Sequence, residues 1–163
     1  MPEDLGHAKN TLEWLLRLNP DADHALMVAA YAHDIERARP DRYQRHMFAN
    51  YDDFKRAHAR EGSLRLSELL RNYPLSQAFI NECARLVEHH EHGGDARSDV
   101  LKDADSLSYF DHNLAFYYER EGYQSTLKRA RWGYQRLSSR AQARFHTLAP
   151  EDPVLQLLLR EAC

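Results

Sequence analysis

Apolar residues recur every three or four positions along nearly the whole chain, and no stretch shows the apolar–polar alternation of a β-strand. The sequence therefore predicts an all-α fold. Proline and glycine mark the expected helix ends, as at Asn19-Pro20, before Pro40, at Tyr73-Pro74 and in the HGGD segment. The expected helices cover about residues 3–18, 21–39, 52–72, 76–92, 99–120, 123–137, 139–148 and 152–161.

Local signals refine these boundaries. Ser76 and Ser98 are expected to cap the fourth and fifth helices, because a serine hydroxyl accepts a hydrogen bond from a free N–H of the first turn. Gly62 could bend the third helix. The 163 residues are expected to form one domain, a helical bundle with its core at about 3–120 and the C-terminal helices of 123–163 packed on that core.

Composition and charge restrict the expected cellular location and partners of the protein. The chain starts without a basic segment followed by an apolar run, and no apolar stretch reaches membrane-spanning length, so a cytoplasmic protein without a membrane partner is expected. The formal net charge of −3 argues against nucleic acid as a partner, although residues 123–163 carry more basic than acidic side chains and could meet an anion. The oligomeric state stays open.

Ten histidines are the most unusual feature of the composition, and several fall on inward helix faces. His33 follows Leu26, Ala29 and Ala30 at helical spacing, and Asp34 is next to it. The same test places His90 inward more clearly than His89, and Asp105 inward with Asp103 about 160° away. The inward groups, at least one from each of the first five helices, are His7, His33, Asp34, His58, His90 and Asp105.

So many ionisable groups facing a core need compensation. A buried carboxylate without a counter-charge is costly, and a metal ion would supply positive charge. One inward histidine is commonly a structural residue, whereas a dinuclear metal centre between facing helices would account for the whole set. Imidazoles and carboxylates without thiolates suit Fe, Mn or Zn.

These residues stand in an order that resembles the HD superfamily of metal-dependent phosphohydrolases, whose H…HD…D residues lie on a five-helix bundle. The resemblance covers roughly residues 5–110 and includes GHAKNTLEWL, YAHDIER and LKDADSLSYF. AHAREGSLRL and VEHHEHGG are similar to the additional ligand segments of dinuclear members. The matching residues are His7, His33, Asp34, His58, His89 or His90, and Asp105.

The resemblance implies a ligand assignment. One ion would bind His7, His33, Asp34 and Asp105, and a second would bind His58 with His89 or His90, bridged by Asp34. Two departures narrow the substrate: no GYP follows the histidine pair, and Arg37-Ala38 stand where alarmone hydrolases have Glu-Asp. Neither cyclic dinucleotides nor alarmones are therefore expected as substrates.

The expected function is hydrolysis of a nucleotide or another small phosphate ester or anhydride by a metal-activated water. The cofactor would be one or two divalent ions, with Fe or Mn favoured and Zn, Co, Ni or Mg as alternatives. A mixed-valence di-iron oxygenase, as in inositol oxygenase with its similar ligand set, and a non-catalytic nucleotide-binding regulator are the alternative functions.

Roles for individual residues follow from this expectation. Asp34 would bridge the ions, and the proton donor would be His58, His89 or His92. Glu36 and Glu91 could orient ligand histidines, although most glutamates are solvated surface charges. The basic side chains expected to contact the substrate are Arg37, Lys102, Arg131 and Arg136.

Overall fold

The computed structural model of the chain describes residues 2–163, and within this range it contains helices and the turns between them. The all-α prediction is confirmed. Among residues 2–163, every helix is either too short or too polar to serve as a membrane span. In chain order the elements are α1 (Pro2–Leu18), α2 (His24–Ala32), η1 (Ile35–Ala38), η2 (Arg45–Met47), α3 (Tyr51–Leu70), α4 (Gln77–His89), α5 (Ala96–Ser108), the π-helical turn η3 (Tyr109–Asn113), α6 (Leu114–Arg136), α7 (Ser139–Phe145) and α8 (Pro153–Ala162).

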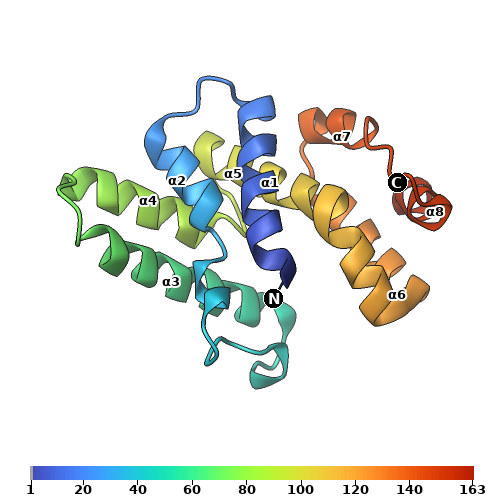
Figure 1. Cartoon of the computed structure of the whole chain (residues 1–163), viewed down its shortest axis with the longest axis horizontal. Helices are drawn as coiled ribbons and strands as arrows, with labels where there is room; N and C mark the ends of the chain where they lie inside the picture. The colour runs from blue at the N-terminus through green and yellow to red at the C-terminus, as the bar shows by residue number, and fades with distance from the viewer. Residues whose placement is uncertain (1) are drawn as a thin grey trace.

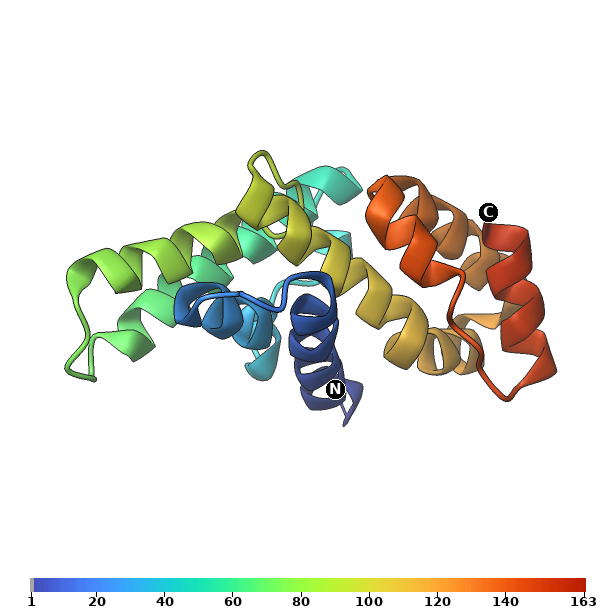
Figure 2. The same ribbon diagram turned by 90° about the horizontal axis from the view of Figure 1, so that it is seen from above.

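The helices are arranged along one long axis (Figure 1). The hairpin of α3 and α4 lies at one end, α1 packs across α5 in the middle, and α6, α7 and α8 form the other end. Figure 2 shows α5 continuing through η3 into α6, so that this segment connects the two ends.

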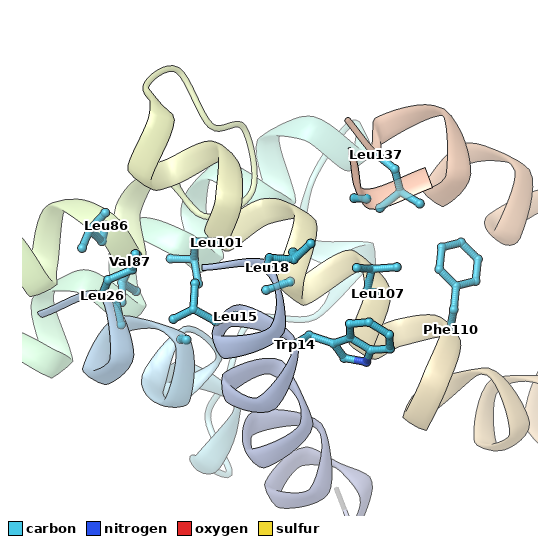
Figure 3. Close-up of a cluster of buried hydrophobic side chains, with 14 of the residues drawn as sticks. Trp14, Leu15, Leu18, Leu26, Leu86, Val87, Leu101, Leu107, Phe110 and Leu137 are labelled. Carbon is cyan, nitrogen blue, oxygen red and sulfur yellow. The ribbon is translucent and has the colours of Figure 1, made fainter. Parts of the chain in front are cut away.

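One apolar cluster runs through the molecule from α1 to α8 (Figure 3). Towards the α3–α4 hairpin it contains Leu26, Leu86 and Val87, and towards the C-terminal helices it contains Leu107 and Phe110. The helices beyond residue 122 share this core. The ionisable residues of interest lie beside the same core, where α1, α3 and α5 approach the ends of α2 and α4.

Two boundaries near the site differ from the sequence expectation. The second helix ends at Ala32, and Asp34 leaves the helical region at φ −100° and ψ 19°, so the His-Asp pair lies on a turn. The fifth helix is capped by Asp95, which accepts hydrogen bonds from the N–H groups of Arg97 and Ser98. Ser98 is instead a buried residue of the first turn.

Two glycines allow local features that the sequence pattern did not specify. Gly62 leaves α3 unbroken and lies where α3 packs against the His-Asp turn, at a position where a Cβ would be in van der Waals contact with the carbonyl oxygen of His33 at 3.4 Å. Gly122 has φ 75° and ψ 175°, a conformation that favours glycine, and α6 kinks there. The π-helical turn η3 precedes this kink.

Candidate metal centre

Five segments bring imidazoles and carboxylates to one buried place. His7 comes from α1, the His33-Asp34 pair from the turn after α2, and His58 from α3. His90 follows the last residue of α4, and Asp105 lies on α5. His33, His58 and His90 are at most 1% exposed. The structure thus brings together all six residues that helical spacing placed inward.

The first part of the site is a triangle of three ligand-type atoms. His7 Nε2 lies 3.1 Å from Asp105 Oδ1 and 3.2 Å from His33 Nε2. The third side, from His33 Nε2 to Asp105 Oδ1, measures 3.5 Å. Ligand atoms held about 2.1 Å from one ion are roughly 3.0 to 3.4 Å apart in octahedral or tetrahedral geometry. The triangle has the size that one divalent ion requires.

Asp34, His58 and His90 form an adjacent group whose ligand atoms lie within 4.8 Å of one another. Asp34 Oδ1 is 2.8 Å from His58 Nε2. Its other oxygen, Oδ2, lies 3.7 Å from His33 Nε2 and 3.9 Å from His7 Nε2. Asp34 therefore directs one carboxylate oxygen towards each group, as a residue between two ions would.

Hydrogen bonds on the far side of the rings fix how the imidazoles are presented. His33 donates from Nδ1 to the carbonyl oxygen of Ala30 at 2.8 Å, and His90 donates from Nδ1 to that of Val87 at 2.6 Å. Because a carbonyl oxygen can only accept, Nδ1 carries the proton in both rings. Each neutral ring then presents its Nε2 lone pair to the site.

The two remaining imidazoles are held in the same way by side chains. Ser108 donates its hydroxyl proton to the carbonyl oxygen of His7 and accepts from His7 Nδ1 at 2.8 Å. His58 donates from Nδ1 to Glu36 Oε2 at 2.8 Å, and Glu36 also accepts from the backbone N–H of Tyr43. All four rings thus turn Nε2 towards the carboxylates.

This arrangement needs added positive charge. In neutral imidazoles, the Nε2 lone pairs of His7 and His33 would oppose each other at 3.2 Å. Burial lowers the pKa of His33, but Asp34 and Asp105 outweigh it and raise the pKa to about 9. Burial likewise opposes, and Asp34 and Glu36 produce, a rise in the pKa of His58 to about 9. A proton or a metal ion therefore belongs between these groups.

The pKa values of the Asp34 and Asp105 carboxylates also favour a bound cation. Burial alone would raise the pKa of Asp34, but Arg37 and the His33 and His58 rings hold it well below its usual value. For Asp105, His33 and His7 overcome the same effect of burial. Both side chains are ionised at neutral pH. Burial lowers the pKa of His90 to about 4, so its ring is neutral and its Nε2 lone pair is available.

A second buried polar cluster lies beside the first. Glu91 accepts from Lys55 Nζ and, at 3.1 Å, from Arg136 Nη2. Glu91 and Lys55 are buried, and Arg136 also donates to the Glu91 carbonyl oxygen at 2.7 Å. Glu91 Oε1, 3.9 Å from His90 Nε2, forms a third ligand-type group with His90 and Asp105. The expectation that Glu91 and Glu36 are solvated surface charges is therefore wrong, because both side chains are buried and contact charged partners.

Several residues expected at the site lie elsewhere. His89 is exposed, and its Nδ1 is 3.4 Å from the carbonyl oxygen of Gly93. His92 is also exposed. The chain turns His90 inward where α4 ends and leaves His89 and His92 exposed. His90 is the member of the adjacent pair that the structure brings to the site.

Two of the four expected substrate-binding cations also lie outside. Lys102 pairs with Asp99 at 3.6 Å, and Arg131 is exposed and donates to the carbonyl oxygen of Glu161. Arg37 and Arg136 line a cavity over the ligand set, together with Asp34 and Asp105. Asp103 lies on the opposite face of α5 from Asp105, as helical spacing predicts. Its carboxylate accepts hydrogen bonds from the backbone N–H and the hydroxyl of Ser138.

Sequence reasoning missed Lys55, which pairs with Glu91, and the hydrogen bond of Ser108 to His7. Lys55 precedes His58 by three positions and so shares its helix face, which was the one available signal. Ser108 shares a face of its helix with Asp105, but its contact with His7 is recognisable only once α1 is placed against α5. Arg129 belongs to the basic C-terminal stretch that the sequence offers as an anion contact, and its place beside the site depends on how α6 packs.

A family model described as a domain of unknown function, DUF4202, matches residues 1–158. The chain belongs to the DUF4202 family. No curated protein and no solved structure matches this DUF4202 chain. The family description states no activity, so a function for the DUF4202 chain has to be argued from the arrangement of its own side chains.

Proposed function

We propose that this protein is a metal-dependent phosphohydrolase that acts on a nucleotide or another small phosphate compound. The observation that carries the proposal is the convergence of four Nε2 atoms, each fixed by an Nδ1–H donor bond, on the carboxylates of Asp34 and Asp105. If the rings were neutral, acceptors would face acceptors here, so the cluster requires either protons on the rings or a metal ion in their place.

Two ions fit the donor set. His7, His33 and Asp105 would hold one, and Asp34, His58 and His90 would hold the other, with the second oxygen of Asp34 directed towards the first group. The mixed nitrogen and oxygen ligands favour Fe or Mn, and Zn, Co, Ni and Mg remain alternatives. Divalent ions bound there would acidify a water molecule and neutralise phosphoryl charge.

The other side chains position these groups and the substrate. Glu36 and Ser108 orient His58 and His7 from behind. Arg37 forms an ion pair with Asp34, Nε to Oδ2 at 3.1 Å, and lines the cavity above the site, where its guanidinium donors would meet a phosphoryl oxygen. Phosphoryl transfer depends mainly on such positioning and charge stabilisation.

The test is to purify the protein without chelator, determine its metals, and assay it against a panel of nucleotides, sugar phosphates and phosphate anhydrides. We expect bound divalent metal and phosphate release that chelator abolishes and the same metal restores. His33→Ala should lose both metal and activity, with helix content by circular dichroism retained. A fully metal-loaded protein that releases no phosphate from any compound would contradict the hydrolase assignment.

The same preparation separates the other functions. Oxygen consumption with a half-reduced di-iron signal would favour an oxygenase, whereas activity in a colourless Mn- or Zn-loaded protein would exclude it. Nucleotide binding without turnover would favour a regulator. Both cysteines are free thiols, which accords with the cytoplasmic setting that this proposal includes.

A further inference from the structure

Arg129 occupies an unusual position on α6. Its guanidinium lies 5.1 to 5.7 Å from the ring centres of four aromatic side chains and donates to the Tyr51 hydroxyl. The four rings belong to Tyr51, Tyr109, Tyr117 and Trp132. An aromatic enclosure attracts a cation but does not neutralise it.

The neighbouring arginines of the site are paired, and Arg129 is not. Arg37 has Asp34 as its partner, and Arg136 has Glu91. Among the described residues, no carboxylate oxygen lies within 4.0 Å of the Arg129 guanidinium. A charged group held in a largely aromatic setting without a counter-charge is expected to have an anionic partner.

Arg129 stands where two cavities meet. A cavity of about 50 Å³ lies over the ligand set and includes Asp34 and Asp105 in its lining. A wider cavity of about 500 Å³ opens beside it, and Arg37, Tyr109, Asn113 and Arg129 line both. These four residues stand where the inner and the outer cavity adjoin, and this place is called the passage below.

Two further polar atoms at this passage lack partners. The Tyr109 hydroxyl and Asn113 Oδ1 are enclosed, and within the described residues neither makes a hydrogen bond of regular geometry. They stand at the two ends of the π-helical turn η3, a type of turn that is frequent at functional sites. The passage thus combines an unpaired cation with unused hydrogen-bonding groups.

The size of the inner cavity limits what it can take. Since one water needs about 10 to 15 Å³ measured in this way, 50 Å³ admits a few waters or a single phosphoryl group. A phosphoryl group there would lie among the carboxylates of Asp34 and Asp105 and the guanidinium groups of Arg37 and Arg129, all of which line the cavity. The remainder of the molecule would extend through the passage into the outer cavity.

We propose that Arg129 is the phosphate-binding residue of this site, and that the substrate is a phosphomonoester whose organic part lies in the outer cavity. The inference rests on the proposed function and adds the substrate class to it. A monoester has one substituent and three terminal oxygens, so its phosphoryl group fits the inner cavity while its single organic part extends into the outer cavity. A diester would need a second organic group in the 50 Å³ cavity.

The aromatic lining of the outer cavity indicates a planar organic part. Tyr43 and Phe116 line the cavity and are 38% and 40% exposed, so their ring faces are available to a ligand. Stacking on such rings is tolerant of ring identity. We therefore expect ring-bearing monoesters to bind better than those without a ring.

The test uses orthophosphate as the probe, titrated calorimetrically into protein as purified and again after saturation with Mn²⁺. Arg129→Met should weaken phosphate binding about tenfold or more, because a charge-assisted hydrogen-bonding group is lost. Lys128→Met, which removes the same charge from the exposed neighbouring position, should leave the affinity unchanged. Metal content and circular dichroism are measured on each variant.

An unchanged phosphate affinity in Arg129→Met overturns the proposal, as does a wild-type protein that does not bind phosphate. If Arg129→Met fails to fold, Arg129→Lys and Tyr109→Phe replace it, and unchanged affinity in both overturns the proposal equally. Dimethyl phosphate, a diester, should bind wild type at least about tenfold more weakly than phosphate, and equal binding removes the monoester assignment.

These readouts separate the two proposals. Failure of the proposed function would appear as absence of bound metal or of any phosphate release from the panel. Failure of the Arg129 proposal would appear in the phosphate titration, which needs no turnover. With an active protein, 4-nitrophenyl phosphate should be hydrolysed and its bis-ester should not, and the reverse preference would contradict the monoester class.

Discussion

Two buried polar clusters lie side by side in this protein, and the cost of burying charge is compensated differently in each. In the cluster of Lys55, Glu91 and Arg136, one carboxylate contacts two cations, so charges are paired within the chain. In the ligand set, imidazole nitrogens and carboxylate oxygens face one another at 2.8 to 3.9 Å. Among residues 2–163, Arg37 is the one lysine or arginine that pairs with these carboxylates, and it contacts Asp34.

The difference separates a structural cluster from a functional one. A paired cluster needs nothing more to be stable, whereas a set of converging acceptors gains from an added proton or metal ion. Substitution of Lys55 in the first cluster should therefore change stability and leave metal content intact. Substitutions in the second should change metal content and activity.

The largest contrast is expected on α5, between Asp105 and Asp103, which lie on opposite faces. Asp105→Asn should lower bound metal and reduce hydrolysis about a thousandfold, since transition-state charge loses several kcal/mol of stabilisation. Asp103→Asn should keep the metal, because its carboxylate bonds Ser138 instead. Metal analysis and urea unfolding of both variants test this, with a loss of about 1 to 3 kcal/mol expected for Asp103→Asn.

If Asp103→Asn lost metal as readily as Asp105→Asn, the distinction between the two faces of α5 would be wrong.

The second largest effect is expected in the paired cluster. Lys55→Met leaves Glu91 with Arg136 alone and should lower the free energy of unfolding by about 3 kcal/mol, as is typical when one partner of a buried ion pair is removed. Bound metal per chain should stay at the wild-type value. Loss of metal at unchanged stability in chemical denaturation would show that the two clusters are not separate in function.

A smaller contrast concerns pH. Because the pKa values of His33 and His58 are raised to about 9, both rings are protonated at neutral pH in the metal-free protein, and metal has to displace these protons. Metal affinity should therefore rise by about tenfold or more per pH unit between pH 6.5 and 8.5 and level off above 9. Competition with a chromophoric chelator, corrected for its own protonation, measures it.

Stability of the metal-free protein should follow the opposite trend. A folded-state pKa above the ordinary value of 6.5 means that the contribution of these two rings is complete below pH 6.5 and is lost as pH rises through 9. A metal affinity that does not change between pH 6.5 and 8.5 would count against His33 and His58 as ligands.

The smallest effect distinguishes two neighbouring histidines. His89→Ala should change neither metal content nor activity by more than about twofold, because the side chain is exposed. His90→Ala should lose the ion held with Asp34 and His58. Measuring both variants in one series decides between them, and the opposite result would reassign the ligand.

The sequence predicted most of the fold because its signals are local. The first and third helices match their structural boundaries within about two residues, and the fourth begins directly after its expected cap, since Ser76, Pro20 and Pro74 act on adjacent backbone. The fifth helix differs, because neither the π-helical turn η3 nor the kink at Gly122 leaves a mark in apolar periodicity.

For the candidate site, helical spacing could indicate which side chains face inward but not what they contact. It selected His90 over His89 and Asp105 over Asp103, both as the structure places them. It could not pair Lys55 with Glu91, which are far apart in the chain, or enclose Arg129 in rings from three different segments. Such contacts depend on how helices pack.

We propose that one metal centre is formed by His7, His33, Asp34, His58, His90 and Asp105. Its most direct test is elemental analysis of protein purified without chelator, with metal expressed per chain. We predict a divalent metal at close to two equivalents, falling sharply in Asp34→Asn. Less than about 0.1 equivalent in the purified protein, with no uptake of Fe, Mn, Zn, Co, Ni or Mg on addition, would contradict the account.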